Sequence, residues 1–199
     1  MKHKGFTLVE LIVVVGLITI LLVLVLSSFS KNRMKTRDNL RVAHIDTIRL
    51  ALEQYRNSCG VFPATLEVEA DNGRNGTCDY KLGNFLPEIP TAPEREGNSL
   101  LISGTVPNAA VFNGYFYAGL STGVDGVGPC YEYHLGAELE FATNNGQDSS
   151  YHLSEDHDFE NEEGDFDARC AGSVNDFGSS NPATDDLNGL YDFRSTNNH

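Results

Sequence analysis

The stretch MKHKGFTLVELIVVVGLITILLVLVLSSFS, residues 1–30, decides the fold of this chain. A short basic start with Lys2 and Lys4 leads into an apolar run from Phe6 to Leu26, 21 positions long, in which Glu10 is the only charged residue. Roughly 20 apolar residues in a helix cross the hydrocarbon core of a bilayer. The run therefore predicts a membrane-spanning helix at residues 6–30.

Two ordinary explanations of this segment fit less well. A secretory signal peptide has an apolar stretch of about 7 to 15 residues, and the run here is longer, although Ser27 and Ser28 could mark a cut site. An anchor that is never cut fits the length and the basic start, which marks the cytoplasmic side. It gives no reason for Glu10, because a carboxylate in hydrocarbon is costly and usually marks a functional pairing.

The octapeptide KGFTLVEL, residues 4–11, resembles the processing site of type IV prepilins and of the related pseudopilins of type II secretion. The resemblance implies that a prepilin peptidase cuts after Gly5 and that Phe6 becomes the N-methylated mature N-terminus. It also implies that Glu10 pairs with the terminal amine of a neighbouring subunit. The alternative for Glu10 is a simple place in the first helical turn, where the helix dipole favours an anion.

The helix is expected to continue as an amphipathic stem over residues 31–57. Its apolar positions recur at helical spacing on one face, and they are Ile45, Ile48, Leu52 and Tyr55. No proline interrupts residues 6–62, and Gly60 is a natural C-cap. A helix over residues 6–57 is about 78 Å long. The junction ALEQYRN (51–57) and GVFP (60–63) is again similar to that of pilins and major pseudopilins.

Residues 58–199, here called the head, are long enough for one small domain. Strand-forming residues between glycine and proline predict strands at 99–104, 111–119 and 131–139. We expect these strands to form an antiparallel meander laid over the apolar face of the stem. The prediction is thus an α+β fold with four segments: a leader (1–5), a transmembrane and assembly helix (6–30), the stem (31–57) and the head (58–199).

Four cysteines, Cys59, Cys78, Cys130 and Cys170, all lie beyond the apolar run. None forms a C-x-x-C pair, which argues against a thioredoxin-like or structural zinc site. In an oxidising compartment they would form disulfides. Three connectivities are open, and pairing nearest neighbours would close two irregular loops; four buried reduced thiols are the alternative.

Charge is distributed unevenly. The chain carries a net charge of −14, and residues 57–199 hold five basic against 24 acidic side chains. A head this acidic repels nucleic acid, so no nucleic-acid partner is expected.

The densest acidic run, residues 155–167, contains eight carboxylates. They are a candidate calcium site, which the resemblance to major pseudopilins also favours, with ligands from Asp156, Asp158, Glu160, Asp165 and Asp167. Asn161 stands where the helix-loop-helix calcium pattern requires glycine, and a solvated loop is the alternative. A weaker candidate is the trio Asp185, Asp186 and Asp192.

No catalytic pattern is convincing. Residues 119–123, GLSTG, match the nucleophile elbow G-x-S-x-G, but residues 124–129, VDGVGP, cannot begin the helix that the elbow requires. His134, His152 and His157 lack metalloprotease spacing. We therefore expect a turn at residues 119–123 and no enzymatic activity.

The predicted function is that of a structural subunit of a type IV pilus-like filament, with no required cofactor and a calcium ion as an option. The resemblance implies as partners other copies of the chain, minor pilins, a prepilin peptidase, an assembly platform and an ATPase motor. The subunit would lie in the cytoplasmic membrane with its head outward, and afterwards in an extracellular or periplasmic filament. The alternatives are a major pseudopilin of type II secretion and a membrane-anchored binding domain that never polymerises.

Overall fold

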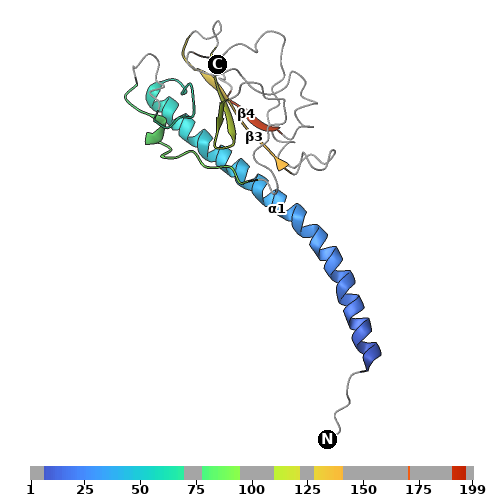
Figure 1. Cartoon of the computed structure of the whole chain (residues 1–199). Helices are drawn as coiled ribbons and strands as arrows, with labels where there is room; N and C mark the ends of the chain where they lie inside the picture. Colours follow the sequence, from blue (N-terminus) through green and yellow to red (C-terminus); the bar gives the residue numbers. More distant parts are fainter. Residues whose placement is uncertain are drawn as a thin grey trace, which may run out of the picture.

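The structure is a computed structural model that describes residues 7–69, 78–94, 110–121, 128–140, 170 and 190–195. One long helix, α1 (Leu8–Cys59), is followed by a short 3-10 helix, η2 (Leu82–Asn84). Four strands follow: β1 (Ala110–Phe112), β2 (Tyr115–Leu120), β3 (Glu132–Glu138) and β4 (Leu190–Arg194). In Figure 1, α1 is a gently curved rod with the sheet beside its C-terminal part. The predicted α+β class is confirmed.

Helix α1 has 52 residues and is bounded by clear capping signals. Thr7 is the N-cap, and Gly60 is the C-cap, with φ +75° and its N–H donated to the carbonyl of Arg56 at 2.7 Å. A left-handed conformation at this position favours glycine. The predicted C-cap is confirmed, and the helix is shifted by two residues from the predicted range of 6–57.

The sheet is an antiparallel meander of order β1-β2-β3-β4, as the sequence pattern predicted for its architecture. Residues 111–119 were predicted as one strand, and this is wrong, because Asn113 and Gly114 turn the chain between β1 and β2. Both have positive φ, +52° and +93°. An Asn-Gly pair suits the two-residue hairpin turn that matches strand twist, so the hairpin signal was present in the sequence.

Strand β3 lies within the predicted range of 131–139. Strand β4 was not predicted, and its register with β3 runs from His134 opposite Arg194 to Glu138 opposite Leu190. The predicted strand at 99–104 falls outside the described residues. The last strand of the sheet therefore comes from the end of the chain.

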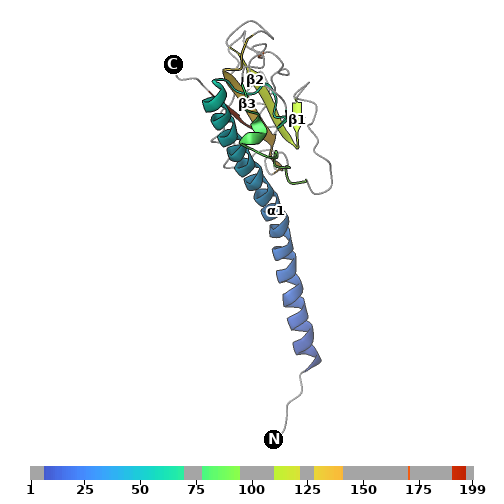
Figure 2. The same cartoon turned by 90° about the vertical axis from the view of Figure 1, so that its left-hand side faces the viewer.

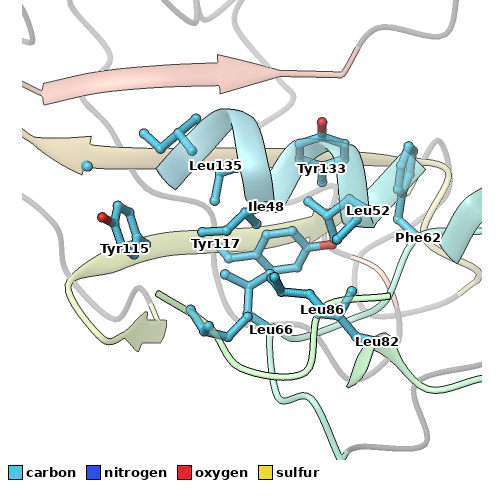
Figure 3. Close-up of a cluster of buried hydrophobic side chains, with 14 of the residues drawn as sticks. Ile48, Leu52, Phe62, Leu66, Leu82, Leu86, Tyr115, Tyr117, Tyr133 and Leu135 are labelled. Atoms are coloured by element: carbon cyan, nitrogen blue, oxygen red, sulfur yellow. The ribbon is translucent and has the colours of Figure 1, made fainter. Parts of the chain in front are cut away.

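The core forms where the sheet meets the stem (Figure 2). The predicted apolar face is confirmed, since all four of its residues, Ile45, Ile48, Leu52 and Tyr55, have no exposed surface. Opposite them lie three fully buried tyrosines, Tyr115, Tyr117 and Tyr133 (Figure 3). Fully burying one large side chain contributes about 1.5–3 kcal/mol. Packing against this apolar face of the stem therefore holds the sheet on the helix.

The buried phenol groups are neutral, and two of them have a clear hydrogen-bond partner. The hydroxyl of Tyr115 lies 2.7 Å from Nδ1 of His44. The hydroxyl of Tyr117 donates to the carbonyl of Pro63 at 2.6 Å. Burial, with the nearby charge of Glu53, raises the pKa of Tyr133 to about 12. Tyr133 also packs edge-on against Phe62, with ring centroids 4.7 Å apart.

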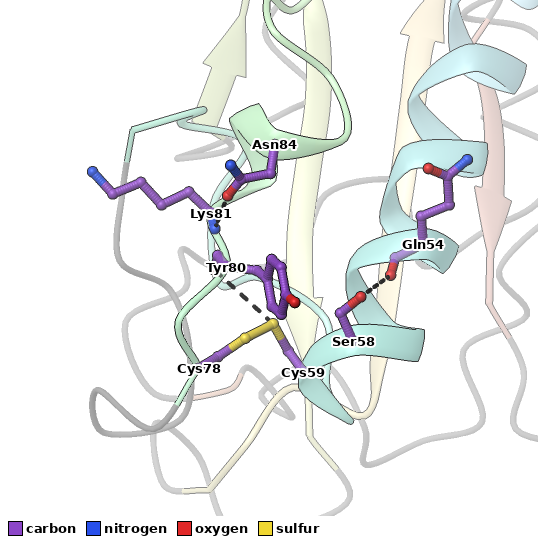
Figure 4. The surroundings of a disulfide bond; sticks show 7 residues. All are labelled: Gln54, Ser58, Cys59, Cys78, Tyr80, Lys81 and Asn84. Carbon is purple, nitrogen blue, oxygen red and sulfur yellow. Dashed lines mark hydrogen bonds between the residues drawn. A yellow bond between two sulfur atoms is a disulfide. The ribbon is translucent and has the colours of Figure 1, made fainter.

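Two disulfides join the nearest cysteines in the sequence, Cys59 to Cys78 and Cys130 to Cys170. No cysteine in the structure is free. The first bond ties the end of α1 to the segment before η2 and is partly exposed (Figure 4). The second is buried, with Cys130 4% and Cys170 0% exposed. Each bond stabilises a small domain by about 2–4 kcal/mol.

Candidate assembly segment

The N-terminal half of α1 projects away from the sheet and has no cover (Figure 1). Every described side chain from Leu8 to Val23 is exposed, and the large apolar ones are 50–74% exposed. A soluble monomer rarely exposes a contiguous apolar patch of this extent. The segment is therefore a candidate contact surface for another apolar phase or chain.

The length and apolar character of the helices were also compared with what a membrane span requires. Within the described ranges, no helix has both the length and the apolar character required to cross a membrane.

Thr7 and Glu10 form a capping box at the start of this segment. The backbone N–H and the hydroxyl of Thr7 each donate to Oε2 of Glu10 at 2.9 Å, and the N–H of Glu10 donates to the Thr7 hydroxyl at 3.2 Å. Such a box satisfies backbone donors at the helix start reciprocally. Glu10 therefore caps its own helix, as the helix-turn alternative expected.

The same geometry leaves Glu10 able to bind a cation from another chain. Both hydrogen bonds from Thr7 end on Oε2, and within residues 7–69 no other side chain forms a hydrogen bond or ion pair with Oε1. Gly5 and Phe6, the predicted cleavage residues, lie outside the described residues. Thr7 was not singled out from the sequence, although its T-x-x-E spacing is a capping signal.

A cluster of four charged residues, the junction cluster, joins α1 to the end of β3 and consists of Arg37, Asp38, Arg41 and Glu140. Arg37 Nη2 and Arg41 Nη2 lie 2.7 Å from Oε2 and Oε1 of Glu140, respectively. Arg41 Nη1 lies 2.7 Å from Asp38 Oδ1, which also accepts the N–H of Glu140 at 2.9 Å. The cluster therefore closes a ring of charged hydrogen bonds between helix and sheet.

The junction cluster is buried and electrically balanced. The side chains of Asp38, Arg41 and Glu140 are 2–3% exposed, and that of Arg37 is 18% exposed. Burial raises the pKa of Glu140, but the hydrogen bonds and charges of Arg37 and Arg41 outweigh it and hold that pKa below its usual 4.5. Glu140 is therefore ionised at neutral pH.

Sequence reasoning missed this cluster. It gave Arg37 and Arg41 no role, whereas the structure pairs them with a carboxylate about 100 residues away. The spacing of Asp38 and Arg41 was a weak signal for a helical ion pair. Nothing local pointed to Glu140.

The candidate calcium ligands at residues 155–167 lie outside the described residues, as do Asp185 and Asp186. Asp192 is in β4, but its side chain is not described. Within the described ranges, no group of three or more histidine, cysteine or acidic residues is placed to hold a metal ion. Calcium binding stays a prediction.

The described residues of the apparent nucleophile elbow lie at the end of β2 or directly after it. Gly119 and Leu120 end β2, and Ser121 follows with only 6% of its surface exposed. His134 is buried in β3, and His152 and His157 lie outside the described residues. The described part of this stretch therefore contains a buried serine next to the sheet.

Comparison with known proteins gives one family match. Neither the curated proteins nor the solved structures contain a significant match to the chain. Residues 1–26 match the family model of the prokaryotic N-terminal methylation motif. This segment includes the basic start, the cleavage residues predicted from the sequence and the capping box. The chain thus carries a prokaryotic N-terminal methylation motif, which is consistent with the type IV pilin and pseudopilin family.

Proposed function

We propose that this protein is a structural subunit of a type IV pilus-like filament and that it polymerises through the N-terminal half of α1. The observation that carries the proposal is the exposed apolar rod that begins with Thr7 and Glu10 and lies inside the methylation motif. A prepilin peptidase would remove residues 1–5. The amine of Phe6 would then be available to a neighbouring chain.

The exposed apolar half of α1 would contact lipid before assembly and other helices after it. The apolar run of residues 6–26 supports a stay in the cytoplasmic membrane, with the head outward. In the filament, neighbouring helices would replace lipid. Leaving lipid for a helix bundle gains little hydrophobic free energy, so an assembly platform and an ATPase motor would drive the transfer.

An off-centre head supports an open assembly. The sheet packs on one side of the C-terminal part of α1 (Figure 2), so each subunit presents different surfaces to its neighbours. Contacts of this heterologous kind generate fibres when the rotation between subunits does not close. A pseudopilus of type II secretion would follow the same rule and is the second form of the proposal.

Glu10 would be the charged contact of the assembled core. A carboxylate transferred into hydrocarbon or a helix bundle needs a cationic partner, and the released amine of Phe6 supplies one. Glu10 reaches that environment already held by its own Thr7, through Oε2 alone. The other oxygen would accept the neighbouring amine.

Mass spectrometry of the native N-terminus tests the processing step. We expect a mature chain that begins with N-methylated Phe6. An intact Met1 on native material would support the membrane-anchored binding domain and overturn the filament proposal. A bulky replacement of Gly5 should leave an uncut precursor and no filaments.

Filament assembly of the Glu10→Val variant tests whether the carboxylate of Glu10 is needed for contact between subunits. We expect normal membrane insertion and few filaments in the sheared fraction seen by electron microscopy. Thr19→Val is the matched control, because Thr19 lies in the same exposed segment and its hydroxyl donates only to its own helix at Val15, within the described contacts. Thr7→Ala removes the cap but keeps the carboxylate. Equal defects in Thr7→Ala and Glu10→Val would assign Glu10 to capping instead.

A further inference from the structure

The exposed side of the stem has a regular pattern of its own. At about 100° per residue, this side is centred about 140° from the buried face formed by Ile45 to Tyr55. Six residues on it follow one another at alternating steps of four and three, the spacing of a helix that packs along another helix. All six are exposed, and Leu40 and Leu50 are 46% and 62% exposed. We call them the stem seam: Thr36, Leu40, Ala43, Thr47, Leu50 and Gln54.

The stem seam contains no charged residue, although charged residues are frequent in the rest of the stem. Residues 31–56 include seven basic and three acidic side chains, and none of these ten belongs to the seam. The water-facing side of a helix is normally charged or polar, whereas the centres of protein interfaces are depleted of charge. The seam therefore has the composition of a surface that another helix covers.

The two threonine hydroxyls of the seam already have partners inside the helix. The hydroxyl of Thr36 donates to the carbonyl of Asn32, and that of Thr47 donates to the carbonyl of Ala43, both at 2.9 Å. A hydroxyl buried without a partner is costly, and these bonds avoid that cost. Small residues also let a second helix approach closely. An apolar helix can therefore cover these threonines without leaving their hydroxyls unsatisfied.

The exposed apolar half of α1, residues 8–26, is a suitable occupant, whereas lipid is not. Thr36 is ten residues beyond Leu26, or roughly 15 Å past the end of the apolar run. Headgroups occupy only about 5–8 Å outside the hydrocarbon core. A highly charged partner would find no complementary charge on the seam. An apolar helix matches it, and each copy of the chain has one.

An open filament would bring these two segments side by side. Its subunits are displaced from one another along a common axis, so the apolar half of one α1 passes beside the stem of another copy. Thr47 and Ile18, near the middle of the two segments, are 29 residues apart. A displacement of about 43 Å along the axis sets them at the same height.

We propose that the stem seam is the docking surface for the apolar half of α1 from a neighbouring subunit. The proposal rests on the proposed function, because it requires polymerisation, and it names the surface that the apolar half contacts on the other copy. The seam would face the filament axis. The head, packed on the other side of the stem, would face outward.

Photo-cross-linking in filaments tests this contact. p-Benzoylphenylalanine replaces Thr47 in a minority of the chains, and the sheared filaments are irradiated and analysed by mass spectrometry. The remaining chains contain heavy nitrogen, so links between chains are distinguished from links within one chain. We expect links to residues 8–26 of another chain. The same group in place of Thr91, an exposed residue of the head, should give no links to that segment.

A carboxylate in the seam should prevent assembly. Thr47→Glu would bury a charge against an apolar helix without a partner, and we expect the yield of filaments to fall by more than about tenfold. Leu50→Glu should have the same effect, and the 62% exposure of Leu50 means that the core of the subunit is undisturbed. Thr91→Glu is the matched control, with the same chemical change at an exposed position of the head. Near-ultraviolet circular dichroism of the buried tyrosines checks that each variant is folded.

The outcomes separate the seam from the proposed function. An uncut parent chain that forms no filaments would overturn the proposed function and the seam with it. Normal filaments from both Thr47→Glu and Leu50→Glu would overturn the seam alone. So would links from position 47 to the head of its own chain or to residues 31–57 of a neighbour, because another segment would then cover the seam. An equal loss of filaments in Thr91→Glu would assign the defect to added charge in general and contradict the seam.

Discussion

Replacing Glu140 with glutamine should destabilise the head strongly, although the side chain keeps its size. Glu140 accepts hydrogen bonds from Arg37 and Arg41, and its carboxylate makes the junction cluster neutral. The amide would leave the cluster with a net charge of +1 in a buried position. It would also present a donor toward a guanidinium that needs an acceptor.

The size of the stability loss depends on the contacts that Arg37 and Arg41 would keep in the variant. Removing one partner of a buried ion pair costs about 3–5 kcal/mol. Arg41 would keep its contacts with Asp38 and the carbonyl of Pro93, both at 2.7 Å. Arg37 is 18% exposed and can reach water. We therefore expect a loss at the lower end, about 3 kcal/mol.

Urea unfolding of the full chain in detergent micelles, followed by near-ultraviolet circular dichroism of the buried tyrosines, measures this loss. For a protein of this size, about 3 kcal/mol corresponds to a fall in melting temperature of roughly 6–12 °C. The slope of the unfolding free energy with urea should stay unchanged, because the surface exposed on unfolding is the same.

Glu69→Gln is the matched control, with the same chemical change in an exposed pair. Glu69 lies 3.4 Å from Lys81, and the two side chains are 86% and 50% exposed. Its loss should be within about 0.5 kcal/mol of zero, since exposed pairs contribute little. If Glu140→Gln were no less stable than Glu69→Gln, the junction cluster would not hold the head to the stem.

Three further outcomes follow from the same contacts. Acid should lower the stability of the parent chain more than that of Glu140→Gln. The pKa of Glu140 is lowered in the folded chain, so its stabilising contribution is present above about pH 4.5 and is lost as the pH falls through the folded pKa. Acid unfolding curves that fall equally for the two chains would refute this. Gly119→Ala should lower the free energy of unfolding in urea by roughly 1–3 kcal/mol, because a Cβ there would lie 2.7 Å from the sulfur of Cys170. Gly16→Ala is the control: its Cβ would meet nothing within 4 Å, and we expect no loss of stability. Graded reduction with alkylation and mass spectrometry should open Cys59–Cys78 before the buried disulfide, and equal rates would contradict the difference in burial.

The stem and its end were predictable because their signals are local. Apolar side chains at helical spacing identify the buried face from Ile45 to Tyr55, and a glycine that permits a left-handed conformation identifies the end at Gly60. The capping box was equally readable from Thr7 and Glu10, but the resemblance to prepilins drew attention to Glu10 alone. The hairpin at Asn113 and Gly114 was also readable and was missed.

The amino-acid sequence alone predicts a long helix that begins with an apolar segment, carries one carboxylate near its start and turns one apolar face to a head. Which charged residues of the stem bind the head depends on how the folded chain packs. Nothing in the local sequence distinguishes Arg37 from the other basic residues of the stem, yet Arg37 meets Glu140. Likewise, β4 pairs with β3 although about 55 residues separate them. Helix periodicity is set by neighbours three and four residues apart, whereas these pairings depend on how distant segments pack, and no local pattern encodes that distance.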